Sequence, residues 1–188
     1  MGVESLHSRQ TFGIEELGLL DTSPLKTLDT IIDLFAEAVR AQIVAFMIFD
    51  DNYASLIVRS IVGDVSVRPG PAGVQIGRAA CGLVRTEAGP VCISNLGAHA
   101  NTAQAFERTR IGATGLLAAP VHGPLGETIG ALVAMTPTEH YWTSHQRRLI
   151  GNYALLLTEQ IMFRAALQTV KLMAKERAEM GMRVKFWN

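Results

Sequence analysis

Residues 115–135 read GLLAAPVHGPLGETIGALVAM, and this stretch decides the fold class of the chain. Two apolar runs, 115–121 and 128–135, flank the segment HGPLGE. They predict an antiparallel β-hairpin, because glycine and proline favour a turn and the apolar residues favour buried strands. Pro120 has no backbone N–H to donate, so we expect it at a β-bulge or at an unpaired strand edge.

Three further strands are expected upstream of this hairpin. Residues 43–49, IVAFMIF, end at a turn of Asp and Asn residues and are followed by a second apolar stretch at 54–62. The short gap between these stretches favours an antiparallel pair. After a Gly/Pro-rich loop, a short helix is predicted within 78–88 and a short strand at Val91–Ile93. Another short helix is predicted at 102–109.

Helices at both ends complete the expected fold. The N-terminal lead-in is expected to hold one helical turn near Ile14–Leu20. The first full helix is expected to open at Ser23-Pro24, a favourable N-cap and first helical position. Its apolar face would consist of Leu28, Ile31, Ile32, Phe35 and Val39. From Thr143 to about Gly181 no proline occurs, which predicts one long helix.

Two apolar stripes follow this long helix. One repeats about every 3.5 residues, the period at which helices pair along a seam. It consists of Leu149, Tyr153, Leu156, Gln160, Phe163, Leu167 and Val170. The second stripe lies beside it and consists of Ile150, Ala154, Leu157 and Ile161. The domain's own sheet can cover one stripe only, so we expect a parallel homodimer with the first stripe at its interface.

Composition excludes several classes of function. The chain has 188 residues, of which 48% are hydrophobic, and equal numbers of acidic and basic residues. This balance gives no general attraction to nucleic acid or to an anionic membrane, and neither is expected as a partner. The N-terminus has no apolar signal core, and no apolar run reaches the length of a membrane span. The expected location is therefore the cytoplasm.

Four local sequences occur in an order that resembles a GAF domain. They are LGLLDTSP at 17–24, IGRAACGLVRTEAGPVCISNL at 76–96, IGATGLLAAPVHGPLGETIGALVAM at 111–135, and YWTSHQRRLI at 141–150. The resemblance is to the GAF subgroup found ahead of bacterial kinases and cyclic-dinucleotide enzymes. It implies an α+β fold with a central antiparallel sheet. The terminal helices would lie on one face, and short helices and loops would cover a ligand cleft on the other.

The resemblance also implies a domain organisation and a function. We expect a lead-in over 1–16, a GAF-like sensor domain over 17–166 and a C-terminal helical extension over 167–188. The implied function is non-catalytic sensing or regulation in bacterial signal transduction, with the C-terminal helices of a homodimer passing the signal to a partner protein. Neither a kinase histidine box nor a helix-turn-helix follows residue 181, so we expect the chain to act in trans or to be a piece of a longer protein. The alternative is a dimerisation or protein-interaction module that binds no ligand.

The ligand and any cofactor are not identified by the sequence. The residues expected to line the cleft are Cys81, Val84, Arg85, Asn95, His99, Gln104, Phe106, Arg110 and Thr114. Among them, Arg110 carries a fork of donors suited to an anion. His99 is the one histidine in the loop expected to cover the cleft, and therefore the one candidate haem ligand. No His, Cys, Asp or Glu set has zinc spacing, so no metal site is expected.

The special chemistries of GAF proteins need residues that this sequence mostly lacks. Free methionine sulfoxide reductases carry a cysteine where Cys81 stands, and Cys92 is a candidate resolving thiol. Their principal cysteine, however, belongs to a later loop, and residues 99–106 here contain none. A redox enzyme therefore remains a lesser alternative. The cysteine that holds a bilin is replaced by Ala103-Gln104, and the cyclic-nucleotide signature is absent around Asn95 and Phe106.

Overall fold

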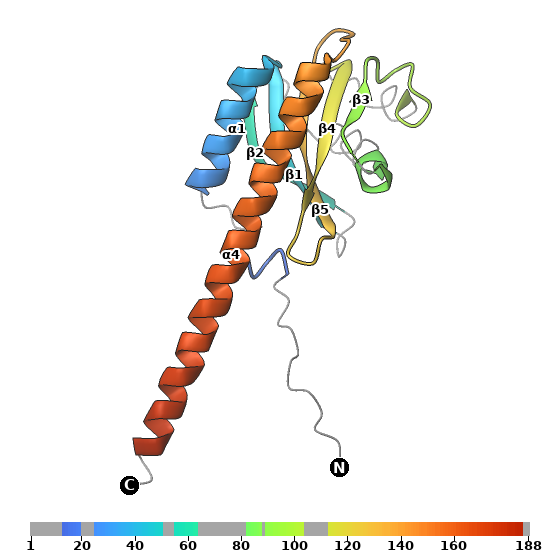
Figure 1. Cartoon of the computed structure of the whole chain (residues 1–188). Coiled ribbons are helices and arrows are strands. Elements are labelled where there is room, and N and C mark those ends of the chain that lie inside the picture. Colours follow the sequence, from blue (N-terminus) through green and yellow to red (C-terminus); the bar gives the residue numbers. More distant parts are fainter. Residues whose placement is uncertain are drawn as a thin grey trace.

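The computed structural model describes residues 13–19, 25–50, 55–63, 82–87, 89–103 and 113–185 (Figure 1). Its main elements are α1 (Lys26–Val39), β1 (Ile43–Asp50), β2 (Ser55–Gly63), β3 (Val91–Ile93), β4 (Gly115–His122), β5 (Thr128–Thr136) and α4 (Ser144–Lys185). The strands form one antiparallel sheet in the order β2-β1-β5-β4-β3. All five strands predicted from the sequence are confirmed, and the fold is α+β.

The β4–β5 hairpin shows how proline is accommodated in the sheet. β3 pairs only with Leu116–Ala118, so Pro120 lies on β4 beyond the end of β3. The β4–β5 register also shifts between Val121 and His122. An unpaired edge and a bulge both spare a backbone N–H, as expected for this residue.

Both faces of the sheet are buried, which explains why β1 reads as a continuous apolar run. Side chains of a strand point alternately to its two faces. Val44, Phe46 and Ile48 belong to the core on the helical side. Ala45 and Met47 belong to a second core on the opposite side. An alternating apolar–polar pattern would appear only if one face met water.

Helices α1 and α4 form a single layer on one face of the sheet (Figure 1). The second apolar stripe of α4 is buried against the sheet as predicted, through Ile150, Ala154, Leu157 and Ile161. Beyond the sheet, α4 extends away from the rest of the domain toward the C-terminus (Figure 1). Within the described ranges, no helix combines the length and the apolar character needed to cross a bilayer.

The beginnings of the two helices differ in how they are capped. Helix α1 starts at Lys26 with Leu25 at the N-cap position and no side-chain cap, so the prediction of Ser23 as N-cap was wrong. Leu25 is half-buried and packs against the core on the helical side of the sheet. At the start of α4, Thr143 Oγ1 accepts from Gln146 N, and Gln146 Oε1 accepts from Thr143 N. This reciprocal pair is a capping box.

Short segments cover the face of the sheet opposite the helices. Residues 82–86 form a helical turn, part of the helix expected at 78–88, and residues 94–103 form a loop. The helix expected at 102–109 lies largely outside the described residues. The lead-in turn is confirmed, since Leu17 N donates to Gly13 O and Leu19 N donates to Ile14 O.

Candidate functional site

The expected ligand face is built from the second core. Its floor consists of side chains from four strands, including Met47, Val133 and Leu116. Val84 from the helical turn and Leu96 from the loop pack directly onto this floor and are almost fully buried. The described part of the covering layer therefore contacts the sheet through apolar side chains.

Val84 and Arg85 occupy different positions on the same turn. Val84 is buried in the second core, where it packs as a core residue. The Arg85 side chain is exposed, and its guanidinium carbon lies 4.3 Å from the centroid of the Phe49 ring. A cation over an aromatic face is attracted by the ring quadrupole. Arg85 therefore links the covering turn to the end of β1.

Three predicted site residues hold the covering loop in shape. Asn95 Oδ1 accepts from Gly97 N, and Asn95 Nδ2 donates to Glu139 Oε2 over 3.3 Å. Thr114 Oγ1 donates to Pro137 O over 2.9 Å. His99 Nδ1 accepts from Asn101 N over 3.4 Å, a contact inside its own turn. These contacts are with the protein's own backbone and side chains.

The remaining predicted cleft residues are Cys81, Gln104, Phe106 and Arg110, and all four lie outside the described residues. Their place in a ligand cleft stays a prediction. The structure does bring the described members together on one side of the sheet. Leu96 N donates to Thr114 O over 2.8 Å, which ties the loop that carries Asn95 and His99 to the start of β4.

Residues 137–143 connect this face to the helices, and sequence reasoning missed them. His140 N donates to Ser94 O over 3.2 Å, and Trp142 Nε1 donates to Ile93 O over 3.4 Å. Arg147 in turn donates to Trp142 O from two guanidinium nitrogens, at 3.2 and 3.1 Å. The capping box at 143–146 was the one local signal that marked this connector.

A groove of about 300 Å³ lies on the helical side, between the start of α1 and the middle of α4. Its walls combine apolar and polar side chains, namely Leu17, Thr27, Leu28, Gln160, Phe163, Arg164, Leu167, Gln168 and Lys171. Arg164 Nη1 donates to Leu17 O over 3.2 Å, so α4 also holds the lead-in turn. This groove opens onto the stripe predicted as the dimer interface.

The predicted interface stripe divides into two parts in the single chain. Leu149 and Tyr153 are half-buried against the helical core, and the Tyr153 ring lies 5.2 Å from that of Phe35. Gln160 is half-buried in the groove. The others are exposed, with 59% of the Phe163 surface and 62% of the Val170 surface open; Leu156 and Leu167 complete the set. The exposed part of the stripe thus begins at Leu156.

Cys92 is poorly placed to form a disulfide with a thiol on the face of the sheet opposite the helices. Its side chain packs toward the helical core, whereas its neighbours Val91 and Ile93 face the other side. Burial raises the pKa of the Cys92 thiol, although the nearby Arg147 charge opposes this. A raised pKa leaves less of the nucleophilic thiolate at neutral pH. Among the described residues, no three His, Cys, Asp or Glu side chains gather as a metal site would require.

Solved structures with the same fold come from proteins of several kinds. The GAF domain of an Acinetobacter phosphoenolpyruvate-protein phosphotransferase is 16% identical, covers 83% of this chain and 92% of its own, and has a TM-score of 0.57. Free methionine-R-sulfoxide reductase from Neisseria meningitidis, solved with its substrate, is 18% identical over 81% and 89%, with a TM-score of 0.58. The PixJ GAF domain of Thermosynechococcus elongatus, in its blue-light absorbing form, is 13% identical over 78% and 91%, with a TM-score of 0.55.

These identities are low enough that the likeness concerns the fold alone. A search of curated proteins found no match to this sequence. The family comparison is more specific, because the sequence matches the GAF domain over residues 23–161. That range runs from the approach to α1 through the whole sheet and into α4, so the match and the architecture agree, and the chain belongs to the GAF domain family.

Proposed function

We propose that this chain is a non-catalytic sensory or regulatory module of bacterial signal transduction, which acts as a homodimer joined through α4. The observation that carries the proposal is the exposed apolar surface of α4. The helix buries one stripe on its own sheet, yet Leu156, Phe163, Leu167 and Val170 remain in solvent. Apolar surface of this extent on one helix favours burial against a partner.

Contacts at the two ends of the connector support a route for the signal. Residues 137–143 are bonded to the start of the covering loop on one side. On the other side they are bonded to the first turn of α4. A ligand that binds two arrangements of the loop with different affinity would shift their populations, and the connector would pass that difference to α4.

A second candidate is a dimeric interaction module without a ligand. The direct packing of Val84 and Leu96 on the sheet favours this candidate. In the described part of the covering layer, these two side chains occupy the apolar surface of the sheet that a ligand would otherwise contact. The position and the raised pKa of Cys92 argue against a reductase of the kind found in Neisseria.

Native mass spectrometry of protein purified from cells, together with an absorbance spectrum, separates these functions. A dimer with a defined additional mass would support ligand sensing. A dimer with no additional mass that also binds nothing from a small-molecule extract would favour the interaction module. A chain that stays monomeric at tens of micromolar would refute both.

The dimer surface is tested by introducing a charge into it. Phe163→Glu should weaken self-association by about tenfold or more, because burying an unpaired carboxylate costs more than the roughly 1.4 kcal/mol that corresponds to that factor. Leu125→Glu is the matched control, since Leu125 is 65% exposed and belongs to the β4–β5 turn rather than to α4. Equal dimer affinity in the two variants would contradict the assigned surface.

A further inference from the structure

The groove between α1 and α4 is lined by a row of polar side chains on α4. The row consists of Gln160, Arg164 and Gln168, each four residues after the one before. Residues at this spacing are neighbours on one face of a helix. All three are half-buried. One guanidinium with an amide on either side of it therefore lines one wall of the groove.

Most of the donors on these three side chains are not used by the protein's own described residues. Arg164 Nη1 donates to Leu17 O over 3.2 Å, which is the one contact of this guanidinium within the described ranges. A guanidinium carries several further N–H donors. The side-chain amides of Gln160 and Gln168 bond to no group in the described part of the chain. These donors are available to a bound molecule that offers acceptors.

The groove is also positively charged. Arg164 and Lys171 both line it, and none of its described lining residues is acidic. Neither cation forms an ion pair with another described residue. Long side chains on a helix lean toward its N-terminus, so Lys171 leans along α4 in the direction of Arg164. A half-buried guanidinium that lacks a counter-ion favours an anion, and a carboxylate matches its fork of donors.

The other walls of the groove are mainly apolar. Leu17 and Leu28 are almost fully buried at its base, and Phe163 and Leu167 are exposed on α4 beside the polar row. The lining residues of α4 extend from 160 to 171, whereas α1 contributes two residues at its start, so the groove runs along α4. Its volume of about 300 Å³ is at the lower end of the range for small-molecule sites. This shape and size suit a short chain better than a broad ring system.

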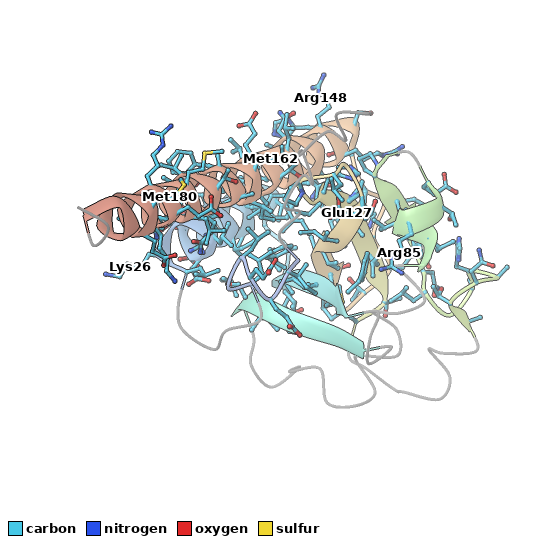
Figure 2. All side chains as sticks on the ribbon, turned by 90° about the horizontal axis from the view of Figure 1, so that it is seen from below. Lys26, Arg85, Glu127, Arg148, Met162 and Met180 are labelled. Carbon is cyan, nitrogen blue, oxygen red and sulfur yellow. The ribbon has the colours of Figure 1, made fainter. Side chains whose placement is uncertain are left out.

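The groove and the expected ligand face lie on opposite sides of the sheet. The groove is formed by α1, α4 and the lead-in turn, whose buried side chains belong to the helical core. Val84 and Leu96 belong to the second core on the other side. Figure 2 shows Lys26 at the start of α1, beside α4, and Arg148 projecting from α4 away from α1. A molecule in the groove would therefore contact neither the covering loop nor Arg148.

We propose that this groove is a second ligand site, which binds a free carboxylate carried on a short unbranched acyl chain. The Arg164 guanidinium holds the carboxylate, and the amides of Gln160 and Gln168 donate to it from either side. Lys171 adds a second positive charge. The acyl chain lies against the apolar walls and is removed from water there. Since one chain supplies every wall of the groove, the inference goes beyond the proposed function and does not depend on the homodimer.

Titration of the full chain with sodium octanoate, followed by NMR chemical shifts of the backbone amides, tests the site. Saturable shifts are expected at Leu17, at the start of α1 and over residues 160–171. Acetate has no chain and octanol has no charge, so each should bind about tenfold more weakly or worse. Octanol that binds as tightly as octanoate would overturn the assignment of an anion. Absence of saturable shifts, or shifts confined to Val84 and residues 94–103, would overturn the site while leaving the proposed function intact.

Substitutions in the groove separate the contribution of charge from that of apolar contact. Arg164→Met should weaken octanoate binding about tenfold or more and leave octanol binding nearly unchanged, because it removes the charge and keeps an apolar side chain. Lys171→Met leaves the bond between Arg164 and Leu17 in place and should weaken octanoate binding several-fold.

Arg148→Met makes the same change on the side of α4 that faces away from α1, and it is the control that should bind octanoate as the unmodified chain does. Equal octanoate affinity in the Arg164 and Arg148 variants would overturn the proposal. A groove that binds no octanoate, in a chain whose self-association falls on Arg164→Met, would instead belong to the dimer surface, which also overturns the ligand site. A monomeric chain that binds octanoate in the groove would refute the homodimer and support this site.

Discussion

Gln146 in the first turn of α4 donates a hydrogen bond from Nε2 to the backbone carbonyl of Val39, the last residue of α1, over 3.2 Å. The same side chain accepts from the backbone N–H of Thr143 through Oε1. One glutamine therefore caps the start of α4 and satisfies a free carbonyl at the end of α1. Carbonyls in the last turn of a helix have no partner within that helix.

Replacing Gln146 separates these two contacts. Gln146→Ala should lower the free energy of unfolding by about 1–2 kcal/mol, because it removes both the cap and the bond to Val39. Gln146→Glu keeps the acceptor for Thr143 N and loses only the donor, so its loss should be smaller. Urea unfolding at a fixed protein concentration measures both. Equal stability of the alanine variant and the unmodified chain would contradict the role given to this residue.

Leu157 anchors α4 in the helical core and is fully buried. Leu157→Ala should lower the free energy of unfolding by about 2–5 kcal/mol, because it removes buried apolar area and leaves a cavity. Leu125→Ala is the control, and its effect should stay within about 0.5 kcal/mol because the side chain is exposed. A similar loss in the two variants would mean that α4 does not pack on the sheet through this stripe.

Gly130 allows β5 to approach β1 closely. A Cβ placed on it would collide with the backbone carbonyl oxygen of Met47 on the neighbouring strand. Gly130→Ala should therefore destabilise the fold by about 1–3 kcal/mol, since backbone atoms in a sheet have little room to shift. Gly82→Ala meets open space and should be nearly neutral. Thermal unfolding of both variants checks this, and a neutral Gly130→Ala would contradict the pairing of β1 with β5.

Cys92 should react slowly with alkylating reagents at neutral pH. Burial raises the pKa of its thiol, so the thiolate is scarcer at a given pH than in an exposed cysteine, and the rate should keep rising at more alkaline pH. Arg147 acts in the opposite direction, so Arg147→Gln should raise the pKa further and slow the reaction. Peptide mapping of iodoacetamide-treated protein measures the rate at this site. Alkylation as fast as in an unfolded peptide would contradict the buried position.

The place of the predicted residues in a ligand cleft stays a prediction, and the structure adds contacts that local sequence does not show. Asn95 and Thr114 were expected to line a cleft. The structure shows both hydrogen-bonded to the connector at 137–143, Asn95 to Glu139 and Thr114 to Pro137. The sequence does not predict such bonds, because Glu139 is 44 residues from Asn95 in the chain. Trp142 was missed for the same reason, since its partner Ile93 belongs to a strand far upstream.

The sequence by itself determined the type and order of the elements. Apolar periodicity predicted the strands and α4, Gly and Pro predicted the turns, and the spacing along α4 separated the buried stripe at Ile150 and Leu157 from the stripe at Phe163. These signals are local, because a turn type or a helical face depends on residues a few positions apart. Only the tertiary structure decided that β5 lies between β1 and β4, and that Gln146 at the start of α4 meets Val39 at the end of α1. Those relations join segments distant in the chain, and they arise from how whole elements pack together.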